Sequence, residues 1–225
     1  MAVPMANDPP FATLNHFAAD LGIPSESDLL RIGISQEKIA TLAREAEHRS
    51  KNLLSSVQAV VNFSNSDTPE GLKEVIQGRI QALANVHSLF VETRWIGAEI
   101  SAIATQELAP YCEENQGRVS IDGPPTLLEP TVAQAIAVTL HELATNAAKY
   151  GSLSDAKGHI DLKWQHKTDG QLILRWTETG GPAVQKPTHQ GFGSRVIERM
   201  IGQLRGKVQF DWLQEGLVCE ISFRA

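Results

Sequence analysis

One helical stretch near the middle of the chain, residues 140–151, limits what this sequence can fold into more than any other. Apolar residues recur at helical spacing through this stretch and just before it, so they form one stripe that must be buried. The members of this stripe are Val132, Ile136, Leu140, Leu143 and Ala147. Glu142, Asn146 and Lys149 are spaced four and three residues apart and therefore share another face of the same helix.

The second face of this helix combines a carboxylate, an amide oxygen and an ammonium group. Such groups suit a magnesium ion and phosphate oxygens. The same spacing is equally typical of an ordinary amphipathic helix whose polar face is solvated. Spacing alone therefore leaves a ligand-binding face and a solvated face as equal alternatives.

The bulk properties of the chain exclude several classes of protein. Its 225 residues are enough for one or two compact domains. The formal net charge of -6 argues against a nucleic-acid-binding role, which usually needs a basic face. No apolar run approaches the roughly 20 residues of a membrane helix, and the N-terminus lacks the basic and apolar segments of a signal peptide. Cys112 and Cys219 show no metal-binding spacing. We expect a cytoplasmic protein that binds neither nucleic acid nor membrane.

Two long helical patterns occupy residues 35–93. The first begins at Ser35, which is the expected N-cap, and a turn cluster at residues 65–69 separates it from the second. The first pattern has its apolar positions at Ile39, Leu42, Ala46, Leu53, Val57 and Val60. The second has them at Leu72, Val75, Ile76, Ile80, Leu83, Val86 and Phe90. We predict an antiparallel hairpin whose stripes cover each other only in part, and therefore a homodimer in which two hairpins form a four-helix bundle.

His48 lies on the first of these helices. It follows Ala46 by two residues, off the apolar seam, and is therefore expected to face water. A solvent-facing imidazole is partly neutral at pH 7 and can act as a nucleophile. Taken alone, this position is more typical of an ordinary surface histidine. His87 is expected to pack against the seam of the second helix.

From Trp95 onward the pattern changes to alternating strands and helices. Helices are predicted at residues 99–111, from about 130 through the stretch described first, and at 194–204; strands are predicted at 118–121, 159–164, 172–176, 207–212 and 217–223. The predicted fold class is α+β, with a mixed sheet covered by helices on one face. The chain is thus expected to divide into an N-terminal segment (1–34), a helical hairpin (35–93) and an α/β sandwich (94–225).

Two glycine clusters flank a short variable stretch in the predicted sandwich. Glu178, Gly180 and Gly181 follow a strand, and Gly191 and Gly193 precede a helix. Glycines let a backbone approach a ligand closely, and a helix N-terminus offers free N–H groups to phosphates. A carboxylate at a strand end can accept a hydrogen bond from an exocyclic amine such as that of adenine. Each signal alone is weak, because Gly-x-Gly is most often a turn.

Four motifs resemble the signatures of the HWE sensor histidine kinases. They are residues 47–52 (EHRSKN), 141–151 (HELATNAAKYG), 176–178 (WTE), and 181–182 (GP) with 191–193 (GFG). The resemblance covers about residues 36–225, and His141, Trp176 and Glu178 match the letters of the family name. The chain departs from the pattern at Ser50, where an apolar residue is usual, and in having only residues 1–34 where a sensor domain is expected. We interpret that segment as the remnant of a sensor or a link to one.

The resemblance implies a function. Members use Mg²⁺ and ATP to phosphorylate a histidine on a dimerisation helix, and pass the phosphoryl group to an aspartate of a response regulator receiver domain. By resemblance, His48 is the phosphoacceptor, Glu142 is the acid that orients the attack, and Asn146 holds magnesium. Residues 35–93 then form the dimerisation and phosphotransfer hairpin, and residues 94–225 the ATP-binding domain.

The resemblance also implies the residues of the ATP site, with Glu178 in the adenine-binding place that usually holds Asp. These residues are Asn146, Lys149, Tyr150, Glu178, Gly180, Gly181, Gly191 and Gly193. The runner-up interpretation is a histidine phosphotransferase or phosphatase-type interaction module with little kinase activity. The intact motifs at residues 141–151 and 191–193 disfavour a nucleotide site that has lost the ability to bind ATP.

Overall fold

The computed structural model describes residues 36–112, 117–183 and 191–224. The expected N-cap Ser35 and the N-terminal segment 1–34 lie outside the described residues. The chain divides into two compact units, Met1–Ser55 and Ser56–Ala225, and the boundary falls inside a single long helix. No helix among the described residues is long and apolar enough to cross a membrane.

Two long helices are present where the sequence predicts them. α3 spans Gln36–Phe63 and α4 spans Pro69–Glu92. The Thr68 side chain accepts a hydrogen bond from the Gly71 N–H and caps α4, while Pro69 occupies the first turn, where its missing N–H is not needed. Within the second unit, Val60 of α3 and Leu83 of α4 share a buried cluster with residues of two further helices. The four-helix bundle stays a prediction.

The second unit contains a five-stranded mixed sheet, as predicted. Its strand order is β2-β4-β5-β7-β6; β2 and β4 are parallel and the other neighbours are antiparallel. The strands are β2 (Val119–Asp122), β4 (His159–His166), β5 (Gln171–Thr179), β6 (Lys207–Leu213) and β7 (Gly216–Arg224). A separate antiparallel pair joins β1 (Ala98–Glu99) to β3 (Leu127–Leu128).

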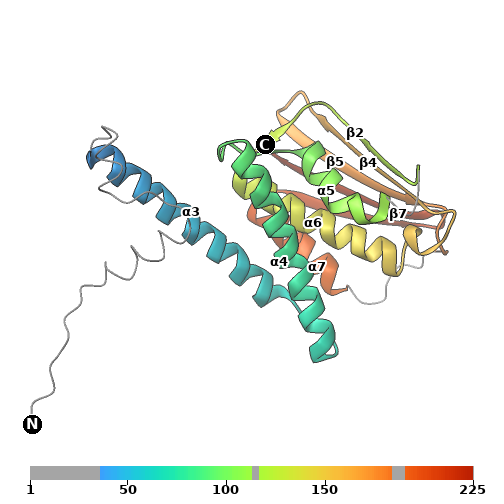
Figure 1. Cartoon of the computed structure of the whole chain (residues 1–225). Coiled ribbons are helices and arrows are strands. Elements are labelled where there is room, and N and C mark those ends of the chain that lie inside the picture. Colours follow the sequence, from blue (N-terminus) through green and yellow to red (C-terminus); the bar gives the residue numbers. More distant parts are fainter. Residues whose placement is uncertain (1–35, 113–116, 184–190, 225) are drawn as a thin grey trace, which may run out of the picture. The chain divides into compact units, whose positions relative to one another are not determined.

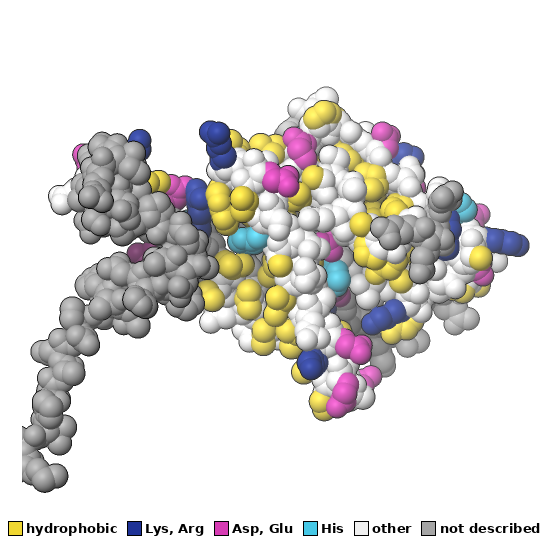
Figure 2. Space-filling model, in the orientation of Figure 1, with side chains coloured by type: hydrophobic (Ala, Val, Ile, Leu, Met, Phe, Trp, Pro, Cys, Tyr) yellow, Lys and Arg dark blue, Asp and Glu magenta, His cyan; other side chains and the backbone are white. Residues whose placement is uncertain are grey.

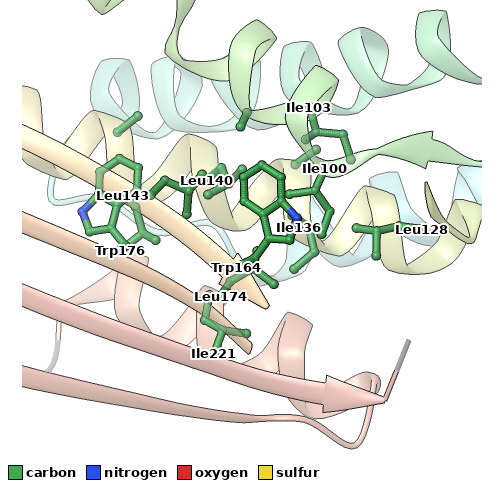
Figure 3. Close-up of a cluster of buried hydrophobic side chains, with 14 of the residues drawn as sticks. Ile100, Ile103, Leu128, Ile136, Leu140, Leu143, Trp164, Leu174, Trp176 and Ile221 are labelled. Carbon is green, nitrogen blue, oxygen red and sulfur yellow. The ribbon is translucent and has the colours of Figure 1, made fainter. Parts of the chain in front are cut away.

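Three helices cover one face of this sheet: α5 (Ile100–Cys112), α6 (Pro130–Lys149) and α7 (Phe192–Gln203) (Figure 1). The short 3-10 helix η1 (Ser152–Ser154) follows α6. The predicted stripe of α6 points into the core: Ile136, Leu140 and Leu143 are at most 1% exposed. Figure 3 shows these side chains against Trp164, Trp176 and the strand residues Leu174 and Ile221.

The α6 helix is buried on more than its apolar stripe, because α4 packs against its other side. Gln134, Thr139 and Glu142 are all buried polar residues of α6. Of the three residues on its predicted second face, Glu142 is buried, Asn146 is half-buried and Lys149 is exposed. This face is therefore solvated only at its C-terminal end.

Three predicted boundaries differ from the structure. α5 runs from Ile100 to Cys112, one residue later at each end than predicted, and Pro110 lies in its last turn, where it removes a single helix hydrogen bond. β5 continues past Trp176 because β4 pairs with it as far as Thr179, so Glu178 lies inside the strand. α7 begins at Phe192, which puts Gly193 in its first turn.

Candidate functional site

A cavity of about 610 Å³ opens in the second unit. Its walls come from the turn before α4, from α4 and α6, from the first turn of α7, and from strands β5, β6 and β7. Most of the predicted nucleotide-site residues line it. They are Asn146, Lys149, Tyr150, Glu178, Gly191 and Gly193, and the predicted catalytic acid Glu142 lines the cavity as well.

Glu178 forms a buried carboxylate at one end of the cavity, 4% exposed. It lies on the core-facing side of β5, continuing the row of Leu174 and Trp176. Its Oε1 accepts a hydrogen bond from the Trp176 indole Nε1–H at 3.0 Å, and its Oε2 accepts one from the Ser152 backbone N–H at 2.8 Å. Each carboxylate oxygen has a second lone pair, so the group can still accept a hydrogen bond from a ligand.

Gly151 follows α6 and is needed for this arrangement. A Cβ atom on Gly151 would lie 2.1 Å from Glu178 Oε2. Any side chain here would therefore displace the carboxylate. Gly151, the last residue of the motif at residues 141–151, thus makes room for the Glu178 carboxylate of β5. Spacing in the sequence did not reveal this role.

Gly180 and Gly181 do not line the cavity, although the resemblance assigns them to the ATP site. Gly180 has φ +71°, and a Cβ there would lie 2.4 Å from the Lys157 carbonyl oxygen. A Cβ on Gly181 would lie 2.6 Å from Ser152 Cα. Both glycines thus let the chain after β5 pack tightly against the backbone around η1. This backbone includes Ser152, which donates a hydrogen bond to Glu178.

Gly193 brings the first turn of α7 against α6. A Cβ there would lie 2.8 Å from Glu142 Oε2 and 3.1 Å from Asn146 Nδ2. Gly191 is the N-cap of α7 and provides no side-chain cap. The N–H groups of this helix end therefore reach the same wall as Asn146, an arrangement that suits phosphate oxygens.

Asn146 is half-buried, whereas Lys149 and Tyr150 are exposed at the rim of the cavity. The described residues contain no cluster of three His, Cys, Asp or Glu side chains able to hold a metal ion. A magnesium ion at this wall would thus take Asn146 as a protein ligand and complete its shell with phosphate oxygens and water, which is common for Mg²⁺. The residues present fit such a group.

Glu142 has a partner that the sequence did not predict. Arg79 of α4, 1% exposed, donates from Nε to Glu142 Oε1 at 2.7 Å and from Nη2 to Oε2 at 2.9 Å. The available signal was the position of Arg79 on the apolar stripe of α4, between Ile76 and Leu83. A charged residue on a buried stripe indicates a buried partner.

Further polar contacts join the helices α4, α5 and α6 to one another. His141 Nδ1 lies 3.2 Å from Glu107 Oε2, and Asn85 donates to the other oxygen of Glu107 at 3.2 Å. His87 Nε2 lies 2.9 Å from Gln134 Nε2. Burial lowers the pKa of His87.

The His87 ring also contacts Phe90 and Trp95, with ring centroids 5.2 and 5.4 Å away. Its predicted packing position on α4 is therefore confirmed.

His48 belongs to the first unit and is exposed on α3, as predicted. Asn52 Nδ2, one turn further on, lies 3.5 Å from His48 Nδ1. Ion pairs one turn apart flank the histidine, Arg49 with Glu45 and Lys51 with Glu47. The Lys51 ammonium lowers the pKa of Glu47.

Known proteins resemble this chain in sequence and in fold. Residues 45–125 match the family model of the HWE histidine kinases. A blue-light-activated histidine kinase of Rhizobium johnstonii is 36% identical over 182 residues, which cover 80% of this chain and 52% of that protein. Its counterpart in Brucella anthropi is 34% identical over 188 residues, covering 81% of this chain and 38% of that protein. The chain thus spans about half the length, or less, of these relatives.

Two solved structures of the blue-light activated histidine kinase EL346 of Erythrobacter litoralis have the same fold. The longer superposes with a TM-score of 0.60 at 15% identity, covering 84% of this chain and 60% of that one. Its histidine kinase domain gives a TM-score of 0.54 at 14% identity, covering 78% of this chain and 94% of that one. Together with the family match and the relatives, the motifs lead to one conclusion: the chain belongs to the HWE histidine kinase family.

Proposed function

We propose that this chain is the kinase region of a two-component signalling protein. In this proposal it transfers the γ-phosphoryl group of ATP to His48, and an aspartate on a response regulator receiver domain then receives it. The observation that carries the proposal is the cavity at which Glu178, Asn146, Lys149 and the first turn of α7 converge. Residues 35–93 would serve as the dimerisation and phosphotransfer helices and residues 94–225 as the ATP-binding domain.

The contacts around the cavity suggest how ATP would be held. The Glu178 carboxylate, oriented by Trp176 and Ser152, would accept the exocyclic amine of adenine. Lys149 and the N–H groups at the start of α7 would contact the phosphates. Asn146 would hold magnesium, which supplies charge neutralisation at the phosphate oxygens.

His48 supplies the nucleophile in this mechanism. A neutral ring nitrogen attacks the γ-phosphorus in line, so that a P–N bond forms while the bond to the β–γ bridging oxygen breaks and ADP leaves. The Glu142 carboxylate would orient the ring by accepting the N–H of its other nitrogen. Positioning and charge neutralisation provide most of the rate, since phosphoryl transfer needs little covalent help from the protein.

Exposed apolar side chains on both long helices support a homodimer. Leu42 of α3 and Ile80 of α4 lie on the predicted apolar stripes, yet they are 48% and 38% exposed in the single chain. Figure 2 shows apolar side chains open to solvent on the visible side of the second unit. A second copy would cover such residues by the bundle pairing that the heptad pattern predicts.

A phosphatase activity toward the receiver domain is a second candidate function. Asn52 favours it, because its amide lies beside the His48 ring one turn away and can hold a water molecule.

Incubation with γ-labelled ATP and magnesium tests the main proposal. The chain should take up label that survives base and is lost in acid, as expected of phosphate bonded to nitrogen. A chain that binds ATP by calorimetry but takes no label would support the phosphotransferase or phosphatase interpretation instead.

A further inference from the structure

Arg79 connects the wall of the cavity to the end of α3. Besides its two bonds to Glu142, its Nη1 donates to Ser64 Oγ at 2.7 Å and to the Phe63 carbonyl oxygen at 3.4 Å. Phe63 is the last residue of α3, and Ser64 begins the turn to α4. One buried guanidinium therefore touches both helix α6 and the end of α3.

The contacts leave Glu142 little freedom. Both of its oxygens accept N–H groups from the planar fork of Arg79, a geometry that fixes the plane of the carboxylate as well as its position. The first turn of α7 packs against Glu142 so closely that a Cβ atom on Gly193 would lie 2.8 Å from Glu142 Oε2. Glu142 could rotate only by breaking two charge-assisted hydrogen bonds in a buried place.

The end of α3 is held from a second side. Arg199 of α7 lies over the Phe63 ring, with its guanidinium carbon 4.3 Å from the ring centroid. The last turn of α3 is thus fixed to α7 through its ring and to Arg79 through its carbonyl group. A shift of this turn would therefore displace Glu142 through one side chain, that of Arg79.

We propose that Arg79 is a positioning residue for phosphoryl transfer, which holds Glu142 at the cavity wall and links its placement to the end of the helix that carries His48. The inference rests on the proposed function. A simple structural role would also place an arginine here, because a buried carboxylate needs a partner. The two roles differ in what they predict for the chemical step when folding and ATP binding are intact.

A double-mutant cycle separates them. The proteins are wild type, Arg79→Gln, Glu142→Gln and the double variant, in which two neutral amides can still hydrogen-bond to each other. For each, the rate of His48 labelling at saturating magnesium and ATP is measured beside the Kd for ATP. We expect each single variant to lower the rate by about 100-fold, since a displacement of about 1 Å can have that effect. The Kd should stay close to that of wild type.

The double variant decides whether Arg79 acts through Glu142. We expect its rate to equal that of Glu142→Gln alone, because the two residues form one unit. Arg175→Gln is the matched control, since Arg175 pairs with Glu220 at 3.7 Å on the sheet, in the same compact unit but outside the cavity. It should label like wild type.

Arg79→Lys covers the case in which Arg79→Gln does not fold. Lysine keeps the positive charge but cannot form the two-point contact. It should fold, bind ATP and label at least about tenfold more slowly, the effect of about 1.4 kcal/mol.

If the wild type takes up label, the proposed function is supported, and three outcomes would then overturn the inference about Arg79. They are wild-type rates in the Arg79 variants, losses that multiply in the double variant, or a loss fully explained by weaker ATP binding. A wild-type chain that takes no label would overturn the proposed function and the inference with it.

Discussion

Buried charge around the cavity is matched by specific donors. Glu178 receives one N–H from Trp176 and one from Ser152, and Glu142 receives two from Arg79. An unpaired buried carboxylate would be costly, so these donors are required for the acids to lie where they do. The same donors fix the direction in which each carboxylate faces, which a binding site needs.

Asn146 gives the first prediction at the level of single residues. Asn146→Ala should lower autophosphorylation by about 100-fold or more, the size of effect seen when one preorganised group is removed from a charged transition state. The described residues offer no acidic cluster that could bind magnesium in its place. The initial rate of label incorporation is the measurement, and Gln209→Ala, which removes an exposed amide from β6, is the control. Normal incorporation in Asn146→Ala would contradict the role of this residue.

Glu178 gives a second residue-level prediction, that the chain prefers ATP to GTP. Guanine presents a carbonyl where adenine presents an amine, so the carboxylate would face an acceptor without a donor. A buried unpaired polar group costs roughly 1–3 kcal/mol, which corresponds to about 5- to 150-fold in affinity. Calorimetric titration with both nucleotides measures it.

The matched variant is Glu178→Gln, whose amide can donate to guanine and should narrow the preference. Equal affinity of the wild type for both nucleotides would refute adenine recognition by Glu178.

At the level of elements, the close contact of α4 with α6 leads to a prediction about two helix glycines. Replacing a glycine in a helix by alanine usually stabilises by about 1 kcal/mol. A Cβ on Gly78 of α4 would lie 2.6 Å from His141 Nε2, whereas among the described residues no heavy atom outside the helix lies within 4 Å of such a Cβ on Gly202 of α7. Gly202→Ala should therefore raise the free energy of unfolding, and Gly78→Ala should raise it less or lower it. Equal gains in denaturant titrations would show that α4 does not pack closely on His141.

His87 makes the same interface sensitive to acid. Burial lowers its pKa below the value of 6.5 expected when it is exposed. The neutral ring therefore contributes stability that is complete above about pH 6.5 and is lost as the pH falls below that value toward the folded pKa. Wild type should lose more unfolding free energy than His87→Gln between about pH 7.5 and pH 5.5, measured by chemical denaturation. The same loss in both proteins would show that His87 is not the titrating group.

At the level of the whole molecule, local patterns predicted most of the fold. Helical spacing identified α3, α4 and α6, and alternation identified the hairpins of the sheet, because each signal is contained in neighbouring residues. Boundaries were less accurate: β5 extends to Thr179 because of pairing with β4, a contact between separate segments.

Candidate site residues were predicted where one helix displays them together, as with Glu142, Asn146 and Lys149. Arg79 was missed because its partner lies on another helix, and spacing within one helix carries no information about that contact. Gly180 and Gly181, which the resemblance assigns to the ATP site, do not line the cavity and pack against the backbone around η1. A glycine motif alone does not say which backbone it approaches.

The central claim is that His48 receives the phosphoryl group, and labelling of wild type beside His48→Gln tests it most directly. His48 is exposed on α3, so the substitution should leave the fold and ATP binding unchanged. His159→Gln, which alters another exposed histidine, is the control and should label normally. We predict acid-labile, base-stable label in wild type and none in His48→Gln. Label that persists in His48→Gln, or acid-stable label in wild type, would contradict this account.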